Sequence, residues 1–243
     1  MRLIKLNAID STNSYLKQLS AGASLKDYTV VQADYQTQGR GQMGTQWDSQ
    51  ATKNLMFSVF KDVSFLDYTT TFYLSMVTSL AIVKTLEGFM VPKVKVKWPN
   101  DILSENKKIC GILIENVVKQ GQIKATIIGI GLNVNQTEFA MLPQASSLLL
   151  ITGKVYDLDE LRVSIVKHMQ YYFGYLKKAE YAFLRKAYEK LLFRKDKPST
   201  FAYPNGSTFP GVITGIAANG NLIVQLEDRV LKEFDLKEIS LRY

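Results

Sequence analysis

The chain has 243 residues, of which 47% are hydrophobic and 21% charged, an ordinary composition for a globular protein. Its formal net charge of +8 permits a polyphosphate ligand, an acidic protein partner or nucleic acid. Cys110 is the one cysteine and His168 the one histidine, which excludes an internal disulfide, a thiolate zinc cluster and any site built from several histidines. The sequence has neither an apolar run of membrane-spanning length nor a secretory signal, so we expect a cytoplasmic protein without membrane contact.

The N-terminal segment predicts a strand followed by a helix. Residues 3–9 alternate between apolar and polar side chains, and Asp10-Ser11-Thr12-Asn13 are four residues that favour helix N-caps. Ser11 and Thr12 either cap the helix and nothing more or also donate to a ligand. A helix N-terminus favours anions and carbonyl oxygens, which supports the second role.

The segment QTQGRGQMGTQW, from Gln36 to Trp47, lies between apolar runs at 29–33 and 55–60 that both predict strands. Arg40 stands among three glycines that let the backbone come close to a ligand: Gly39, Gly41 and Gly44. A guanidinium among bare amides suits an anion, and the alternative is a plain hairpin with a solvated charge. The segment is neither a Walker A loop, since no Lys-Ser/Thr follows, nor a Rossmann loop, since it leads into a strand.

The middle of the chain predicts one helix and then a strand. Residues 70–87 carry apolar side chains at intervals of three and four, and Gly88 ends this helix. Residues 94–98 alternate as a strand that runs into Pro99-Asn100-Asp101 and a polar turn.

Two further strands are predicted at 109–115 and 124–130, the second ending in the glycine-rich GIGLNVN that starts at Gly129. Residues 157–180 and 181–194 carry helical periodicity. Beyond them, turn residues separate short runs that predict a small antiparallel barrel, with strands at 201–203, 209–213, 222–226 and 230–234.

The candidate functional residues gather at strand ends and glycine-rich turns. They supply bare amides, one guanidinium, two lysines and one carboxylate, without a nucleophile and base pair. This set suits a reaction driven by charge stabilisation, in which two anions are joined and a phosphorus centre is attacked.

The ordered motifs STN, QTQGRGQMGTQW, KWPNDIL, KKICGILIE, GIGLNVN and EISLR resemble those of biotin protein ligases over nearly the whole chain. Because STN begins at residue 11, the chain resembles the monofunctional class, which has no N-terminal DNA-binding domain. The resemblance implies an α+β fold. It has a class II synthetase-like catalytic domain with a mixed, mostly antiparallel sheet and helices at 1–194, and an SH3-like β-barrel at 195–243.

The resemblance implies an ATP-dependent, AMP-forming ligase. With Mg²⁺, such an enzyme converts biotin to biotinyl-5′-AMP and transfers biotin to a lysine of a biotin carboxyl carrier domain of a biotin-dependent carboxylase. A lipoate or octanoate ligase or transferase of the same superfamily is the alternative, and KWPND with EISLR favours biotin. A nucleic-acid binder is a third option, but residues 198–243 lack a dense basic and aromatic face, so specific DNA binding is not expected. Monomer and homodimer both stay open.

Residue by residue, the resemblance implies three overlapping groups. The biotin group is Ser11, Thr12, Gln36, Gly39, Arg40, Lys108, Gly111, Gly129 and Gly131. The nucleotide group is Arg40, Gln42, Trp47, Asn100, Asp101, Asn133 and Arg242, with Asp101 also facing Mg²⁺. The catalytic group is Arg40, Asp101 and Lys108.

The chain departs from many members of that family directly after GRG. They carry arginines where this chain has Gln42, Met43 and Thr45. An amide can form hydrogen bonds but has no charge, so we expect a weaker hold on the adenylate than an arginine gives.

Overall fold

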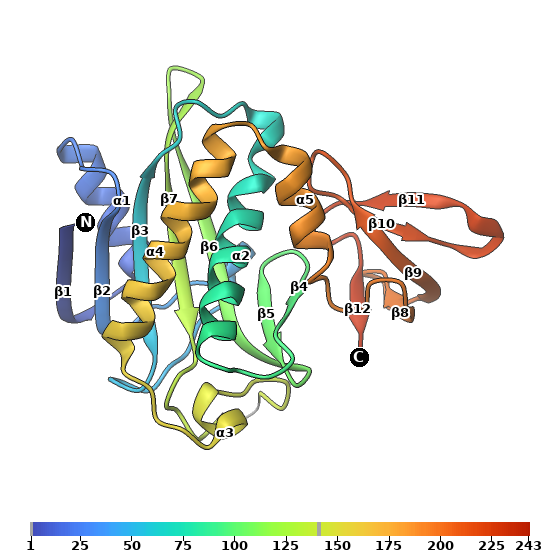
Figure 1. The fold of residues 1–243 in the computed structure, drawn as a ribbon, viewed down its shortest axis with the longest axis horizontal. Helices are drawn as coiled ribbons and strands as arrows, with labels where there is room; N and C mark the ends of the chain where they lie inside the picture. Colours follow the sequence, from blue (N-terminus) through green and yellow to red (C-terminus); the bar gives the residue numbers. More distant parts are fainter. Residues whose placement is uncertain (1, 140–141) are drawn as a thin grey trace.

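The computed structural model describes residues 2–139 and 142–243. Its larger sheet has the strand order β1-β2-β3-β7-β6-β5-β4 (Figure 1). The seven strands are β1 (Arg2–Ile9), β2 (Thr29–Gln36), β3 (Leu55–Asp62), β4 (Lys95–Lys97), β5 (Asp101–Ser104), β6 (Lys107–Lys119) and β7 (Gln122–Leu132). β1 and β2 are parallel, joined through helix α1 (Thr12–Gly22), and every other pairing in the sheet is antiparallel.

Helices cover both faces of this sheet. α2 (Phe72–Gly88) and α4 (Leu158–Lys177) lie in front of it in Figure 1, and α5 (Tyr181–Glu189) follows beside them. α1 packs on the opposite face, where Leu16 forms a small cluster with Val31. The neighbouring Val30 belongs to the main core under α2, so successive residues of β2 are buried on opposite faces. This explains the apolar runs at 29–33 and 55–60, because strands buried on both faces do not alternate between apolar and polar side chains.

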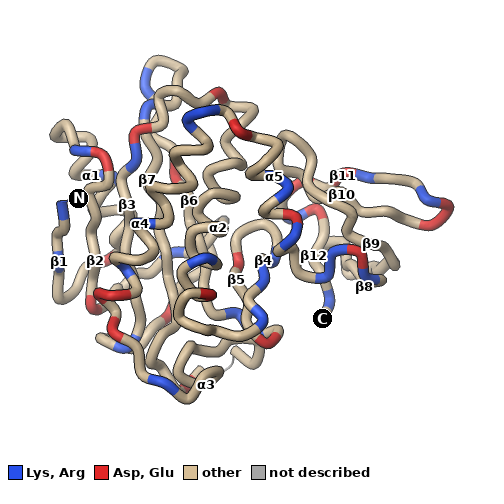
Figure 2. The backbone as a smooth tube through the Cα atoms, viewed as in Figure 1, with Lys and Arg blue, Asp and Glu red and all other residues tan. Residues whose placement is uncertain are grey.

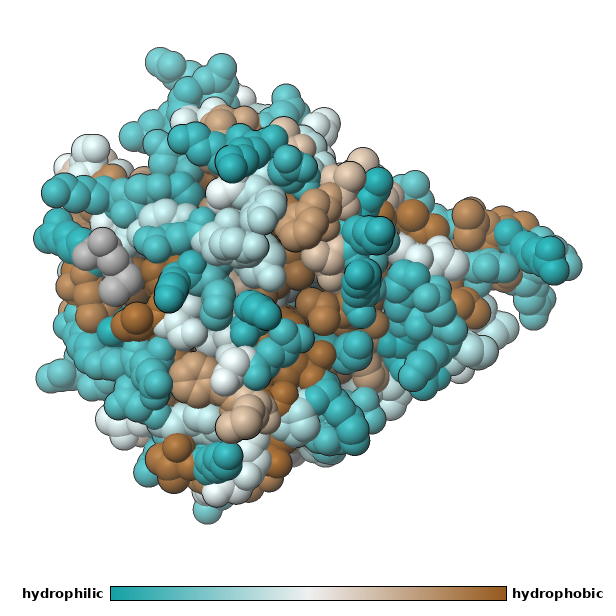
Figure 3. Space-filling model, viewed as in Figure 1, coloured by the Kyte–Doolittle hydropathy of each residue, from teal (hydrophilic) through white to brown (hydrophobic). Residues whose placement is uncertain are grey.

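A second, five-stranded antiparallel sheet follows α5, in the order β11-β10-β9-β8-β12. Its strands are β8 (Pro198–Ala202), β9 (Thr208–Ile216), β10 (Leu222–Gln225), β11 (Leu231–Phe234) and β12 (Ser240–Arg242). The hairpin of β10 and β11 projects from the body of the molecule, with hydrophobic residues on its surface (Figures 1 and 3). Hydrogen bonds attach this sheet to the rest of the chain; for example, Trp98 Nε1 donates to Gly220 O at 2.9 Å, and Ile216 N donates to Oε1 of Glu189, on α5, at 3.0 Å.

The expected fold class, α+β with a mixed and mostly antiparallel sheet, is confirmed. Two local features differ from the prediction. The segment directly after Asp101 forms strand β5, which the sequence did not indicate, so the expected polar turn is confined to residues 105–106. The helix expected at 181–194 ends at Glu189. The helix ends early because the backbone after Glu189 pairs with the edge strand β4. Val96 N donates to Leu191 O, and Phe193 N donates to Val96 O.

Smaller differences concern element bounds. The helix expected from residue 70 starts at Phe72, and the sequence did not indicate helix α3 (Leu148–Thr152) or strand β12. Among the helices in the described part of the chain, none is long and apolar enough to cross a membrane.

Candidate active site

The floor of the site is a row of small residues on the α1 face of the larger sheet. Ile112 and Ile130 point into the main core, so Gly111 and Gly131 point the other way. The two glycines are paired across β6 and β7, and Gly111 is in turn paired with Asp101 on β5. A shallow strip of bare backbone therefore leads to a carboxylate.

A β-bulge brings Lys108 to the same face. Ile102 pairs with Cys110 but Leu103 pairs with Lys108, which leaves Ile109 as the extra residue on β6. Ile109 and Cys110 are both fully buried, as two successive core residues require. Regular alternation would put Lys108 on the face of Cys110, and the bulge turns it toward the glycine strip instead.

A cavity of about 310 Å³ lies over the strip. It is lined by all residues of the expected biotin group except Gly39. Gly39 lies instead in the loop, packed against the backbone of Trp47. A Cβ at this position would lie 2.2 Å from the carbonyl oxygen of Trp47. Trp47 N donates to Gly39 O at 2.9 Å, so the missing side chain allows the loop from β2 to β3 to close as a narrow hairpin.

One end of the cavity is polar and buried. Ser11 occupies the N-cap position of α1, but its side chain makes no capping hydrogen bond. Thr12 Oγ1 donates to Gln36 Oε1 at 3.1 Å and lies 2.7 Å from Ser58 Oγ. Ser11, Thr12 and Ser58 are each at most 4% exposed, so their hydroxyl groups form a fixed polar wall.

The polar wall continues to Arg40. Ser58 Oγ donates to Asn13 Oδ1 at 2.5 Å, and Asn13 Nδ2 donates to Glu115 Oε2 at 2.9 Å. The same oxygen of Glu115 accepts from Arg40 Nη2 at 2.8 Å. Gly129 makes this path possible, since a Cβ there would lie 2.4 Å from Asn13 Oδ1.

Trp47 covers part of the glycine strip. A Cβ on Gly131 would lie 2.6 Å from the indole ring, and one on Gly111 would lie 2.9 Å from it. The ammonium of Lys108 is 5.6 Å from the centre of the ring, within cation–π range. Trp47 therefore packs on the sheet and lines the cavity at once.

Charge is concentrated around Asp101. Lys108 Nζ lies 2.6 Å from Asp101 Oδ1, and Lys97 Nζ lies 4.0 Å from Oδ2. Burial lowers the pKa of Lys97, an effect that Asp101 opposes and Lys108 adds to. Lys97 also stands 4.8 Å from the ring centre of Tyr243. Two cations thus share one carboxylate at the edge of the cavity.

A second cavity of about 530 Å³ adjoins the first at Lys108 and Asp101. Four residues of the expected nucleotide group line it: Trp47, Asp101, Asn133 and Arg242. The amide of Asn133 donates to Ser146 O at 3.0 Å, so part of its hydrogen-bonding capacity is already used. Phe139 and Leu142 add an apolar wall that suits a flat ring.

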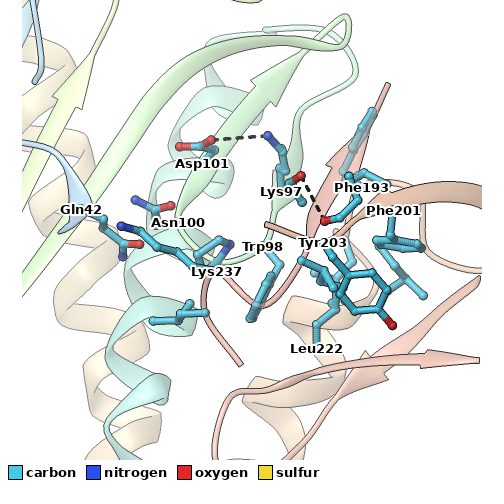
Figure 4. A pocket seen from close by; sticks show the side chains of 18 of the residues that line it. Gln42, Lys97, Trp98, Asn100, Asp101, Phe193, Phe201, Tyr203, Leu222 and Lys237 are labelled. Atoms are coloured by element: carbon cyan, nitrogen blue, oxygen red, sulfur yellow. Dashed lines mark hydrogen bonds and ion pairs between the residues drawn. The ribbon is translucent and has the colours of Figure 1, made fainter. Parts of the chain in front are cut away.

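The other three members of the nucleotide group, Arg40, Gln42 and Asn100, line the first cavity. Gln42 and Asn100 also border a third cavity of about 420 Å³ between the two sheets (Figure 4). In Figure 4, Gln42, Asn100 and Lys237 lie on one side of it, with Phe201 and Tyr203 on the other. All three cavities meet at Asp101.

Sequence reasoning missed Glu115 and Ser58. Glu115 and Gly111 are an even number of positions apart on β6, and such residues lie on the same face of a strand. This spacing would have placed Glu115 on the site face. Ser58 is the one polar residue in the apolar run from Leu55 to Phe60, a signal for a buried hydrogen-bonding role.

Within the described residues, no cluster of three or more acidic, histidine or cysteine side chains could hold a metal ion. Asp101 is the one carboxylate where the first two cavities meet. Mg²⁺ in nucleotide-dependent sites is usually held by one or two carboxylates together with substrate phosphates. The residues present fit an ion that arrives with a nucleotide and do not form a metal site of their own.

Comparison with known proteins decides the family. The model of the biotin/lipoate A/B protein ligase family matches residues 6–133, which include the loop, the glycine strip and Lys108. This chain belongs to the biotin/lipoate A/B protein ligase family.

Relatives within the biotin/lipoate protein ligase family extend the match along the chain. The bifunctional ligase/repressor BirA of Escherichia coli is 30% identical over 98% of this chain and 73% of its own length. The biotin–(acetyl-CoA-carboxylase) ligase of Mycobacterium tuberculosis is 31% identical over 66% of this chain and 59% of its own. The biotin protein ligase from Aquifex aeolicus, solved in complex with biotin and ATP, superposes with a TM-score of 0.84. It is 28% identical, and the match covers 99% of this chain and 98% of that one.

Proposed function

We propose that this protein is a biotin protein ligase that activates biotin with ATP to biotinyl-5′-AMP and transfers biotin to a lysine of a biotin carboxyl carrier domain. The observation that carries the proposal is the Lys108 and Asp101 pair, which stands where the 310 Å³ and 530 Å³ cavities meet. The relative at 31% identity that is named a biotin–(acetyl-CoA-carboxylase) ligase, and the similar structure solved with biotin and ATP, favour biotin over lipoate or octanoate.

In this proposal the 310 Å³ cavity holds biotin. Ser11, Thr12 and Gln36 bind the ureido end, since that end of the cavity offers hydroxyl and amide groups for its N–H and C=O. The glycine strip of Gly111, Gly129 and Gly131 lies under the ring system, and the carboxylate of biotin reaches toward Lys108.

The first step joins two anions, the carboxylate of biotin and ATP, so its rate depends on how well the site neutralises their charges. A carboxylate oxygen of biotin attacks the α-phosphorus of ATP, the bond to the β-phosphate breaks, and pyrophosphate leaves. The ammonium of Lys108 neutralises both reacting groups, and Arg40 adds charge on the loop side of the phosphate. Gln42, Trp47, Asn100, Asn133 and Arg242 hold the nucleotide. When bound, Mg²⁺ held by Asp101 and the phosphates would neutralise charge on the leaving pyrophosphate.

In the second step the neutral amine of the acceptor lysine attacks the carbonyl carbon of the mixed anhydride. An amide bond forms, AMP leaves with the electron pair of the broken bond, and the amine loses a proton. The same ammonium of Lys108 stabilises the oxygen charge that develops on the way.

We also propose residues 1–194 as the catalytic domain and 195–243 as a separate small domain. In support, residues 198–242 form a five-stranded sheet of their own. Its Phe201, Val224 and Phe234 are each 1% exposed or less, and they continue the main hydrophobic core. Gly220 and Ile216 hold it against Trp98 and Glu189.

The test is intact mass spectrometry of a biotin carboxyl carrier domain after incubation with this protein, ATP, Mg²⁺ and equal amounts of biotin, lipoate and octanoate. The expected product carries one biotin on the carrier, and it does not form without ATP. A lipoyl or octanoyl adduct on a lipoyl domain, with none on the biotin carrier, would reject biotin as the substrate. No adduct on either carrier would reject ligase activity.

A further inference from the structure

A basic groove of about 1100 Å³ runs between β4, the end of α5 and β12, beside the cavities of the site. Nine basic and three acidic side chains line it. The basic ones on which the inference depends are Lys95, Lys107, Lys186, Lys190, Lys197 and Arg242. Figure 2 shows Lys and Arg positions gathered around β4, α5 and β12 near the C-terminus.

The acidic residues of the groove do not neutralise it. Glu105 is paired with Lys93 at 3.0 Å and Asp196 with Lys195 at 2.8 Å. Glu189 accepts from the backbone N–H of Ile216, which attaches the second sheet. Within the described residues, the other basic side chains of the groove have no acidic partner within 4.0 Å.

The groove leads to the reaction centre. Gln144, Arg242 and Tyr243 line both the groove and the 530 Å³ cavity proposed for the nucleotide. Tyr243 also lies under the ammonium of Lys97, beside Asp101. A partner seated in the groove is therefore next to the place where the adenylate would form.

We propose that this groove is the docking surface for the acceptor protein and that it selects an acceptor with acidic residues around the target lysine. The inference rests on the proposed ligase function. A lysine alone is a cation, and a surface with such an excess of positive charge repels it. An acceptor that carries acidic side chains beside the lysine is attracted instead, and the field orients it as it approaches.

The acidic residues within the groove favour a protein over nucleic acid. Glu105, Glu189 and Asp196 interrupt the run of cations. A phosphate backbone would meet these carboxylates at close range, whereas a protein can place its charges to match them. The acceptor lysine must reach the adenylate, so its docking surface has to be continuous with the nucleotide cavity. A nucleic-acid site has no such requirement.

The test compares two triple charge reversals in the full chain. The groove variant is Lys186→Glu, Lys190→Glu and Lys197→Glu, three exposed positions. The matched control is Lys26→Glu, Lys154→Glu and Lys178→Glu, which are exposed and line none of the cavities described above. Each reversal removes two units of charge, so both variants go from +8 to +2 and differ in the location of the change alone.

Two half-reactions are measured separately: pyrophosphate release with biotin and ATP, and biotin transfer to an acidic carrier domain at varied carrier concentration. We expect unchanged pyrophosphate release in both variants. Transfer kcat/KM should fall roughly 10-fold to 1000-fold in the groove variant and stay within about 2-fold in the control. Added salt should lower the wild-type kcat/KM and have little effect on the groove variant. Transfer to hydroxylamine, a small neutral nucleophile, should be the same in all three proteins.

Equal transfer by the groove variant and the control would overturn the docking proposal while the ligase function stands. Tight, salt-sensitive binding of the wild type to random duplex DNA, lost in the groove variant that still transfers biotin normally, would assign the groove to nucleic acid instead. No pyrophosphate release from the wild type would be a failure of the proposed function, not of the docking surface.

Discussion

Replacement of Lys108 by alanine should abolish most adenylate formation without unfolding the protein. Lys108 Nζ lies 2.6 Å from Asp101 and lines both cavities proposed for the reacting groups. A unit charge about 4 Å from a developing charge is worth about 4 kcal/mol at an effective dielectric constant of 20. That energy corresponds to roughly 1000-fold in rate. The side chain is 35% exposed, and water will screen part of this field, so the expected loss is about 30-fold to 1000-fold.

The assay is single-turnover pyrophosphate release with saturating biotin and ATP, together with thermal unfolding of each variant. Lys119→Ala is the matched control, because Lys119 is an exposed lysine at the far end of the same strand. Asp101 keeps Lys97 at 4.0 Å when Lys108 is removed, so we expect a modest loss of stability. Adding Asp101→Asn also removes the carboxylate partner of Lys97, so it should recover neither stability nor rate. Near-normal pyrophosphate release from folded Lys108→Ala would refute the role of this charge.

Three further outcomes are expected. Gly131→Ala should weaken biotin binding by about 1–3 kcal/mol, because its methyl group would lie 2.6 Å from the Trp47 indole. Isothermal titration measures this, and Gly174→Ala, where an added Cβ meets nothing within 4 Å, should bind as the wild type does. Gln42→Arg should release biotinyl-5′-AMP more slowly in a rapid-dilution assay, because a guanidinium adds charge beside the phosphate; equal or faster release argues against this. Cys110 is fully buried, and burial raises the pKa of its thiol, so a disulfide reagent should modify the denatured protein and leave the native one unmodified. Rapid labelling of the native protein would contradict its burial.

Local patterns in the chain predicted much of the fold. The Gly-rich segment around Arg40 is a loop between two strands, as the flanking apolar runs indicate. Helix α2 is nearly as long as its periodicity predicts. Such features depend on neighbours in sequence, and physical rules of short range are enough to find them. Strand β5 was missed because four residues after a turn carry little periodicity, and the pairing with β6 that makes them a strand comes from a distant part of the chain.

The sequence by itself determined the set of chemical groups: glycines that expose backbone, one arginine on a loop, and a lysine and an aspartate near each other. The tertiary structure decided how they meet. Arg40 is held by Glu115, 75 residues away in the chain, and no local pattern specifies that pair. Lys108 faces Asp101 because of a bulge at Ile109, where strict alternation predicts the opposite face. Register and bulges arise from hydrogen bonds between strands and from packing of the core, and both are properties of the assembled sheet.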